Sequence, residues 1–294
     1  MEAYLKNIRQ VVPYTPGEQP KQPGIIKLNT NENPYPPSPK VMEKIAEIDR
    51  LRMYPDPAVT ELVESIAAYK GLSKDQVFVG VGSDDVLAMC FMTYFNSELP
   101  ILFPDITYSF YDVWAELFRV PYETISLDQN FKIVPEDYKK PNGGIIIANP
   151  NAPTGLFMPL HELETIIASN PDVIVIVDEA YVDFGGVSAQ CLLDQYKNLV
   201  VVQTFSKSRS MAGMRIGYAM GSPVLIKALH DVKYSFNSYT MNQPSIILGK
   251  ASIEDDAYFK KTCDAIIKTR EWVKKELLKL GFTFPDSKTN FIFA

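Results

Sequence analysis

Cysteine and histidine are scarce in this 294-residue sequence. Its three cysteines, Cys90, Cys191 and Cys263, are odd in number and widely separated, which favours buried free thiols over disulfides or a metal site. The two histidines, His161 and His230, also lie far apart, which disfavours a histidine-based zinc site. We therefore expect that the protein binds no metal.

Long apolar runs and an excess of basic residues are also missing. No run reaches the length of a membrane span, and no basic and apolar leader opens the chain, so we expect a cytoplasmic protein without membrane contact. The 29 Lys and Arg residues are interspersed with 35 Asp and Glu residues, giving a net charge of −6 at pH 7. This pattern gives no indication of a nucleic-acid partner.

Strand and helix patterns alternate through the middle of the chain, and 46% of the residues are hydrophobic, enough for a sizeable core. The patterns predict strands at residues 76–79, 101–103, 121–125, 144–148, 172–177 and 199–203, and helices at residues 40–51, 59–69, 83–95, 110–118, 160–169 and 255–280. Such alternation predicts an α/β fold with a mainly parallel sheet.

Three parts of the chain differ in their patterns. Residues 1–36 are rich in proline and asparagine, which predicts an extended arm that leads into a small domain. Residues 37–235 contain the alternating elements and are expected to form the large domain. Residues 236–294 would complete the small domain only in part, with a strand beginning at residues 289–293.

Lys207 is the most informative single residue. It follows the apolar strand at residues 199–203, so its side chain should lie in a mostly apolar environment, which lowers the pKa of a lysine. Reaction with an aldehyde requires a neutral amine of this kind. Ser206 and Arg215 lie close in sequence and suit a phosphate group. Together these residues predict a site for pyridoxal 5'-phosphate (PLP).

Asp178 ends the second long apolar strand, at residues 172–177, and is followed by Glu179. Two acids at the end of a buried strand carry a large desolvation cost unless something pairs with them. The pyridinium nitrogen of PLP is a suitable partner for Asp178, and Tyr181 would donate to the phenolic oxygen of its ring. A helix cap or a surface ion pair is the alternative role for Asp178.

Candidate residues follow four of the predicted strands. Asn149, Asp178 and Lys207 each come after one strand, and residues 80–84 come after another. Ligands bind at the carboxyl ends of the strands in such sheets, so we expect these residues to share one edge. Residues 82–84 would offer backbone N–H groups at a helix start to a phosphate, although an ordinary N-cap by Ser83 or Asp84 explains the same pattern.

Seven motifs together carry a family resemblance. Residues 149–155, 178–181 and 206–215 resemble the motifs of fold-type I PLP-dependent aminotransferases in order and spacing. Within that group, residues 28–34, 54–56, 80–85 and 107–111 are similar to those of histidinol-phosphate aminotransferases. The resemblance extends over essentially the whole chain.

The resemblance implies a function and further site residues. The enzyme would transfer an amino group from L-glutamate to imidazole acetol phosphate, giving L-histidinol phosphate and 2-oxoglutarate, with PLP as its cofactor and Lys207 as general base and acid. It would be a homodimer in which Tyr54 reaches the cofactor phosphate of the neighbouring subunit. The other implied residues are the cofactor contacts Gly82, Ser83, Asp84, Tyr108, Asn151, Asp178, Tyr181, Ser206 and Arg215, and the substrate contacts Tyr14 and Asn33.

Two departures from the family pattern leave alternatives open. Ala152 stands where most fold-type I aminotransferases have an asparagine that donates to the cofactor ring, and Tyr181 or Asn151 would take over part of that role. The family's chains also continue past residues 287–291 into a tail that carries the arginine for the substrate carboxylate. The alternatives are threonine-phosphate decarboxylase, an aromatic aminotransferase, a PLP-binding regulatory module, and a PLP-binding but inactive short form.

Overall fold

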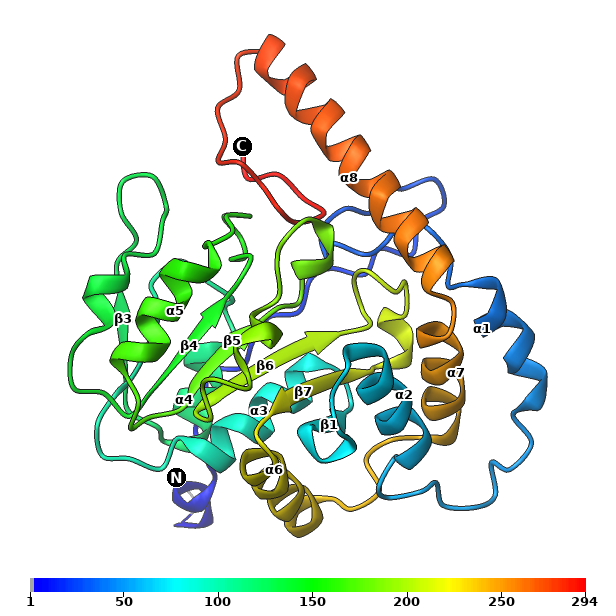
Figure 1. Ribbon diagram of the computed structural model, residues 1–294, viewed down its shortest axis with the longest axis horizontal. Coiled ribbons are helices and arrows are strands. Elements are labelled where there is room, and N and C mark those ends of the chain that lie inside the picture. Colours follow the sequence, from blue (N-terminus) through cyan, green and yellow to red (C-terminus); the bar gives the residue numbers. More distant parts are fainter. Residues whose placement is uncertain (1–2) are drawn as a thin grey trace.

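The computed structural model describes residues 3–294, which form a seven-stranded mixed sheet with helices packed on both faces (Figure 1). The strands lie in the order β1-β7-β6-β5-β4-β2-β3. Their bounds are β1 Val77–Gly80, β2 Ile101–Pro104, β3 Tyr122–Ile125, β4 Gly144–Ala148, β5 Val175–Asp178, β6 Leu199–Thr204 and β7 Gly217–Gly221. Only β7 is antiparallel to its neighbours, β1 and β6. The predicted α/β fold is therefore confirmed.

The helices divide into two layers. One face of the sheet is covered by α2 and its neighbours and the other by α3 and its neighbours. The first layer consists of α2 (Thr60–Lys70), α5 (Leu160–Ser169) and α7 (Gln243–Ile253), and the second of α3 (Ser83–Tyr94), α4 (Tyr111–Phe118) and α6 (Pro223–Phe236). The remaining helices are α1 (Pro39–Lys44) and the long α8 (Asp256–Lys279), which projects from one end of the sheet (Figure 1).

Side-chain alternation along the central strands explains this layering. Val175 and Val177 in β5 pack in the core cluster on the α2 side, whereas Ile176 between them packs in the cluster on the α3 side. The strands β4, β5 and β6 are buried along their whole length. A continuous apolar run is what a strand needs when both faces of its sheet are covered.

Most predicted elements exist, and several bounds differ. The helix α5 has the predicted bounds and α8 lies within one residue of them at each end. The helix predicted at residues 40–51 is shorter, because α1 ends at Lys44 and a 3-10 helix follows at Ile45–Glu47. The strand β7 and the helices α6 and α7 were not predicted.

The strand predicted to begin at residues 289–293 is wrong, since this segment forms no strand. Side-chain hydroxyl groups bond its backbone locally instead. The Thr289 N–H donates to Ser287 Oγ over 3.1 Å, and the Phe291 N–H donates to Thr289 Oγ1 over 3.3 Å. Serine and threonine compete in this way with the hydrogen bonds that a strand makes to its neighbours.

The N-cap predicted at Ser83 or Asp84 is also wrong. The helix α3 begins at Ser83 and its N-cap is Gly82, which has a φ of 89°. A side chain at Gly82 would meet the Arg215 guanidinium, and a Cβ on Gly217 would lie 2.3 Å from the carbonyl carbon of Gly82. Glycine at both positions therefore allows the start of α3 to lie directly against the start of β7.

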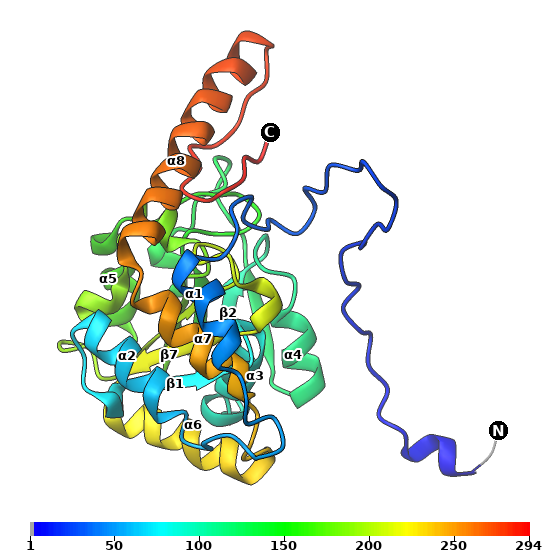
Figure 2. The same cartoon turned by 90° about the vertical axis from the view of Figure 1, so that its right-hand side faces the viewer.

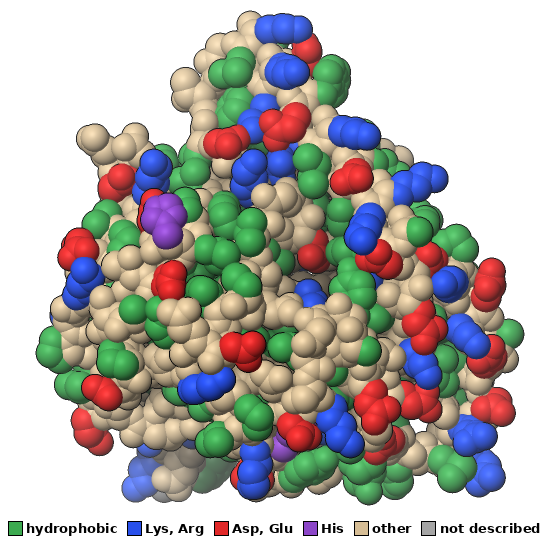
Figure 3. Space-filling model, viewed as in Figure 1, with side chains coloured by type: hydrophobic (Ala, Val, Ile, Leu, Met, Phe, Trp, Pro, Cys, Tyr) green, Lys and Arg blue, Asp and Glu red, His purple; other side chains and the backbone are tan. Residues whose placement is uncertain are grey.

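The segment before α1 runs in an extended path that leaves the body of the protein and includes one 3-10 helix, Ala3–Asn7 (Figure 2). Several apolar side chains in it are exposed, among them Val12, Ile26 and Leu28. On the face drawn in Figure 3, acidic and basic side chains are interspersed. Within residues 3–294, no helix has both the length and the apolar character needed to cross a membrane.

The remaining 3-10 helices are Lys74–Gln76, Pro135–Tyr138, Val182–Phe184, Ala189–Leu192 and Ala212–Met214. All three cysteines are free thiols, with Cys90 and Cys263 buried as expected and Cys191 exposed against expectation. Among the described residues, no cluster of three or more His, Cys, Asp or Glu side chains has the arrangement of a metal site.

Candidate active site

Lys207 lies in the turn after β6, with its side chain largely enclosed. The Lys207 Nζ donates to the backbone oxygen of Thr30 over 2.8 Å, and it lies 5.5 Å from the centre of the Tyr181 ring. Burial lowers the pKa of the Lys207 amine to about 8, while the carboxylates of Asp84 and Glu32 oppose this shift. Near neutral pH this amine exchanges its proton far more readily than an exposed lysine does.

Asp178 ends β5 and faces the helix layer of α3 and α4. Its carboxylate is 5% exposed and accepts hydrogen bonds from the Tyr111 hydroxyl over 2.9 Å and from the Ala180 N–H over 3.2 Å. Burial raises the pKa of Asp178 to about 6, although both hydrogen bonds lower it. A carboxylate oxygen accepts up to two bonds, so Asp178 keeps the capacity to accept one from a ligand.

Tyr181 connects this edge of the sheet with both ends of the chain. Its hydroxyl accepts a hydrogen bond from Asn31 Nδ2 over 3.1 Å, and its ring makes an edge contact with the Phe291 ring at 5.1 Å. Asn290 Nδ2 donates to the Asn31 oxygen over 2.9 Å. Burial raises the pKa of the Tyr181 hydroxyl to about 12, so this group remains protonated and can donate at neutral pH.

A group of polar atoms surrounds the start of α3. The Asp84 carboxylate accepts hydrogen bonds from Arg215 Nη2 over 3.1 Å and from the Tyr108 hydroxyl over 2.9 Å. The N-cap residue of this helix, Gly82, makes no side-chain cap bond. The backbone N–H groups of a first helical turn have no partner within the helix and attract anions. Arg215 and this turn thus form a cradle for an anionic group.

Four predicted site residues have other contacts. Ser206 Oγ accepts a hydrogen bond from Thr204 Oγ1 over 3.0 Å at the end of β6. Asn33 Nδ2 donates to the backbone oxygens of Lys207 and Ser208, over 2.9 and 3.3 Å, and so holds the lysine turn. Tyr14 stacks on the Phe110 ring with 4.2 Å between the ring centres.

The fourth of these, Asn151, is buried and holds a neighbouring loop. Its Nδ2 donates to the Ile106 oxygen over 2.9 Å and to Thr154 Oγ1 over 3.1 Å, and its Oδ1 accepts from Thr107 Oγ1 over 2.8 Å. Both protons of the amide are therefore used in supporting the loop, and neither is left for a ligand. Ala152, next to it, packs against the apolar cluster that contains Tyr181.

Tyr54 lies apart from the Lys207 side chain. It is 82% exposed, and its nearest ring is Tyr239, with 4.8 Å between the ring centres. It lines a surface cavity of about 710 Å³, together with residues of α7 that include Gln243 and Lys250. Within one chain, the structure does not bring Tyr54 together with the other candidate residues.

Sequence reasoning missed three residues that contact the site. In the sequence Tyr111 is only the last residue of the motif at residues 107–111, yet in the structure it is fully buried and its hydroxyl donates to Asp178. Thr30 and Asn31 lie in the predicted arm, and they bond Lys207 and Tyr181. The motif at residues 28–34 was the only sequence signal for the arm residues, and it gave no indication of their contacts.

Glu179, the neighbour of Asp178, points to the opposite face of the sheet. Its carboxylate accepts three hydrogen bonds, from Ser188 Oγ over 2.6 Å, from the Ala189 N–H over 2.6 Å and from Gln203 Nε2 over 2.7 Å. Burial raises the pKa of Glu179 to about 7. Glu179 therefore belongs to a separate buried network and faces away from Lys207.

Comparison with known proteins places these residues in a family. The profile described as aminotransferase class I and II matches residues 23–294. The chain belongs to this family of aminotransferases.

Within this family, the chain is similar to curated histidinol-phosphate aminotransferases. The chain is 52% identical over 289 residues to histidinol-phosphate aminotransferase 1 of Pseudomonas aeruginosa, and the match covers 98% of this chain and 82% of that protein. The family predicted from the sequence motifs is thereby confirmed.

Solved structures agree on the fold. A putative histidinol-phosphate aminotransferase from Erwinia carotovora atroseptica superposes with a TM-score of 0.83 at 26% identity, covering 90% of this chain and 80% of that one. The histidinol-phosphate aminotransferase from Sinorhizobium meliloti, solved in complex with pyridoxal-5'-phosphate, gives a TM-score of 0.81 at 21% identity, covering 90% of this chain and 73% of that one. At the latter identity the likeness concerns the fold alone.

Proposed function

We propose that the protein is a PLP-dependent aminotransferase that transfers an amino group from L-glutamate to imidazole acetol phosphate, giving L-histidinol phosphate in histidine biosynthesis. One observation carries the proposal: the Lys207 amine, with its pKa lowered to about 8, lies at the same sheet edge as the buried carboxylate of Asp178. The 52% identity to a histidinol-phosphate aminotransferase supports the choice of substrates.

The residues at this edge fit PLP. Arg215 and the unpaired N–H groups at the start of α3, with Ser206 close in sequence, suit its phosphate. Asp178 has a free acceptor site for the ring nitrogen, and the Tyr181 hydroxyl is a donor for the ring oxygen. Lys207 and Arg215 would contribute positive charge beside the phosphate, although Arg215 also pairs with Asp84. When bound, PLP supplies an aldehyde that carries the amino group and a ring that accepts electrons.

Lys207 would be the group that moves the proton. Its Nζ alternates between the neutral and the charged form near neutral pH, and so can take a proton from the substrate α-carbon and return it. Asp178 would keep its charge next to the ring nitrogen, with Tyr111 and the Ala180 N–H fixing both carboxylate oxygens. Tyr108, hydrogen-bonded to Asp84, would hold the cradle and offer its ring as a flat surface.

A product assay tests this function. The protein loaded with PLP should convert imidazole acetol phosphate to L-histidinol phosphate with L-glutamate as donor, and Lys207→Ala should not. Release of carbon dioxide from threonine phosphate, without formation of L-histidinol phosphate, would instead identify the decarboxylase. Turnover of aromatic keto acids alone would identify an aromatic aminotransferase.

The assembly and domain predictions remain part of the proposal. We infer a cytoplasmic homodimer in which Tyr54, exposed in the single chain, contacts the cofactor phosphate of the neighbouring subunit. The proposed large domain is residues 37–235, with residues 1–36 as an N-terminal arm and the start of the small domain, and residues 236–294 as the C-terminal part of the small domain. A mixed dimer of Lys207→Ala and Tyr54→Phe subunits should be more active than either parent, because one of its two sites is intact. Activity no higher than that of the parents would contradict this arrangement.

A further inference from the structure

The turn that carries Lys207 is short and sends successive side chains in different directions. The Met211 N–H donates to the Phe205 oxygen over 3.0 Å and closes the turn, in which Ser210 has a φ of 59°. Lys207 reaches towards Thr30, whereas Ser208 Oγ donates to Asp183 Oδ2 over 2.5 Å. The position of the Lys207 backbone therefore depends on how its neighbours are anchored.

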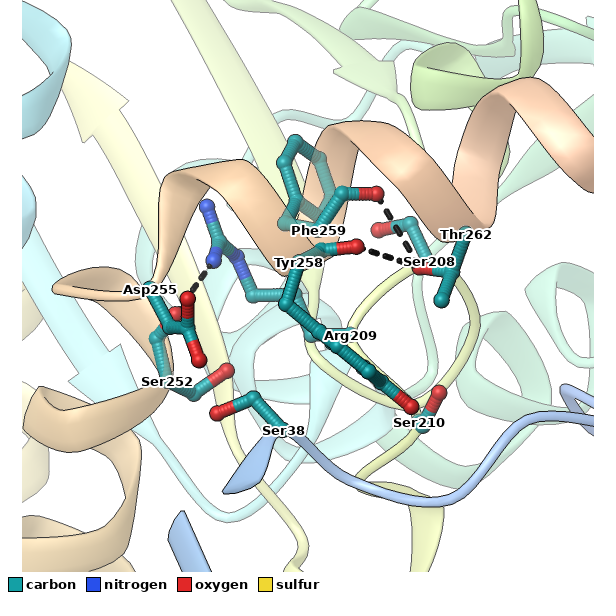
Figure 4. A pocket seen from close by; sticks show the side chains of 9 residues that line it. All are labelled: Ser38, Ser208, Arg209, Ser210, Ser252, Asp255, Tyr258, Phe259 and Thr262. Carbon is teal, nitrogen blue, oxygen red and sulfur yellow. Dashed lines mark hydrogen bonds between the residues drawn. The ribbon is translucent and has the colours of Figure 1, made fainter. Parts of the chain in front are cut away.

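Arg209 anchors the turn among aromatic rings. It is 7% exposed, and its guanidinium lies over three aromatic rings, with its central carbon 4.1 Å from the centre of the Phe259 ring, 5.0 Å from that of Tyr69 and 5.5 Å from that of Phe205. Its Nη1 donates to the Ser252 oxygen over 2.8 Å (Figure 4). These partners come from α2, α7, α8 and the end of β6.

The charge of Arg209 is balanced only indirectly. Arg215 and Arg270 each pair with a carboxylate, but Arg209 forms no ion pair within residues 3–294. One link to an acid runs through Tyr69, whose hydroxyl donates to Asp256 Oδ1 over 2.8 Å. An apolar side chain of similar length would fill this aromatic cage without the cost of burying a charge. The guanidinium contributes a rigid plane that stacks on the rings and a directed hydrogen bond.

A small cavity of about 10 Å³ adjoins Arg209, and several of the residues that line it carry hydroxyl groups, among them Ser38, Ser210 and Tyr258 (Figure 4). The buried Ser210 Oγ, on the next residue, has no hydrogen-bond partner. A cavity of this size holds one water molecule at most. The cage therefore excludes bulk water from the rear of the lysine turn and has no room for a substrate.

We propose that Arg209 is a positioning residue for Lys207, which ties the lysine turn to α2, α7 and α8 and so fixes where the Lys207 amine lies. Asn33 holds the same turn from the side of the arm through the Lys207 and Ser208 oxygens. The turn is thus fixed from both sides. The catalytic part of this inference rests on the proposed aminotransferase function.

The test compares two substitutions of Arg209 with one of Arg270, a second buried arginine, which donates to the Phe184 and Thr289 oxygens. Arg209→Met removes the charge and the plane, Arg209→Lys keeps the charge but not the plane, and Arg270→Met is the matched control. In the protein without PLP, the pH dependence of acetylation of Lys207 by acetic anhydride, followed by peptide mass spectrometry, reports the pKa of the amine. The other charged groups that act on the Lys207 amine are Asp84 and Glu32, which raise its pKa, and Arg215 and Lys27, which lower it, and all four are unchanged in these variants.

A positioning role predicts that both Arg209 variants shift the midpoint of Lys207 acetylation upward from about 8, by at least about half a pH unit, because the amine is less enclosed. Arg270→Met should leave the midpoint unchanged while lowering the melting temperature. With PLP and substrates, both Arg209 variants should lower kcat by about tenfold or more, with little change in KM for L-glutamate.

Two outcomes would overturn the proposal. A midpoint that is unchanged in both variants would mean that Arg209 is only structural, and an unchanged midpoint in Arg209→Lys with a shift in Arg209→Met would mean that only its charge matters. If Arg209→Met does not fold, Arg209→Lys decides alone. The acetylation result does not depend on activity, so failure of the proposed function and failure of this inference can be told apart.

Discussion

Asp178 and Glu179 are adjacent buried acids at the end of β5, yet their surroundings differ. Glu179, on the α2 side of the sheet, accepts hydrogen bonds from two side chains and one backbone N–H, and the Gln203 that serves it is itself bonded by Lys70 and Tyr218. Asp178, on the α3 side, accepts one side-chain and one backbone hydrogen bond. The protein supplies three donors to the Glu179 carboxylate and two to that of Asp178, which therefore keeps more room for a ligand.

This difference separates a structural acid from one available for chemistry. Burying a carboxylate is costly in either case, and burial raises the pKa of both. Around Glu179, three hydrogen bonds from a fixed network offset part of that cost. Around Asp178 only two hydrogen bonds do so, and a cation at an open acceptor site would offset more of it. The predictions below follow from this contrast.

The largest effect is expected from Lys207→Ala. Removal of the amine takes away the group that moves the proton, so activity should fall by at least about 10³-fold. The melting temperature should stay the same or rise, because a poorly solvated amine is lost. Product formation and thermal unfolding measure the two effects. Retention of activity would require another lysine, and borohydride reduction of the PLP-loaded protein with peptide mapping would identify it.

The second prediction concerns Asp178→Asn, which should keep the fold but lower kcat by about 10² to 10³-fold, because an amide cannot hold a charge on the ring nitrogen. The new amide can donate to the Tyr111 hydroxyl, whose own proton then loses its acceptor, so we also expect a loss of about 1–3 kcal/mol in the free energy of unfolding. A kcat near that of the parent would mean that Asp178 is only structural.

Glu179→Gln is the matched comparison. The new amide would face the Ala189 N–H or Gln203 Nε2, and neither of these donors can reverse, because Gln203 Oε1 is held by Lys70 and Tyr218. We expect a loss of about 1–3 kcal/mol in the free energy of unfolding from the unpaired donor. Denaturant titration measures it. The folded variant should keep most of the parent's kcat. A large fall in kcat with little change in the free energy of unfolding would contradict the contrast with Asp178.

The smallest effect is expected from Tyr111→Phe. Its hydroxyl stabilises the ionised form of Asp178, so its loss should raise the pKa of Asp178 above about 6. Since the ionised form is the active one, the rise of kcat/KM on the acid side should move to higher pH, and kcat should fall by about tenfold. The pH dependence of kcat/KM measures this shift. An unchanged profile would mean that Tyr111 does not influence Asp178 during catalysis.

The interior of the sheet could be predicted because its strands are apolar throughout. β4, β5 and β6 need no neighbours to be recognised as buried strands. β7, with the sequence Gly-Tyr-Ala-Met-Gly, has no such pattern. It becomes a strand because it lies between β1 and β6 and bonds both. Tertiary context of this kind cannot be read from the segment itself.

The candidate site could be predicted only in part. Lys207 and Asp178 could be found because they follow recognisable strands, and the ends of parallel strands share an edge. The contact between Tyr111 and Asp178 joins residues 67 positions apart and depends on how α4 packs. The contacts of Thr30 with Lys207 and of Asn31 with Tyr181 depend on the return of the arm to the sheet. The sequence marks these arm residues only as part of a motif and does not indicate what they contact.

The close approach of Gly217 to Gly82 has a consequence for synthesis on the ribosome. In the sheet β1 pairs only with β7, in which Met220 is the partner of Val77 and Gly217 that of Gly80. The strand β1 therefore has no neighbour until the ribosome has synthesised β7. A nascent chain that ends before residue 217 therefore exposes an unpaired strand edge, which favours association with other chains. It also lacks the anion cradle, since Arg215 and the start of β7 complete it. Cofactor capture is thus a late event, possible only after most of the chain has emerged.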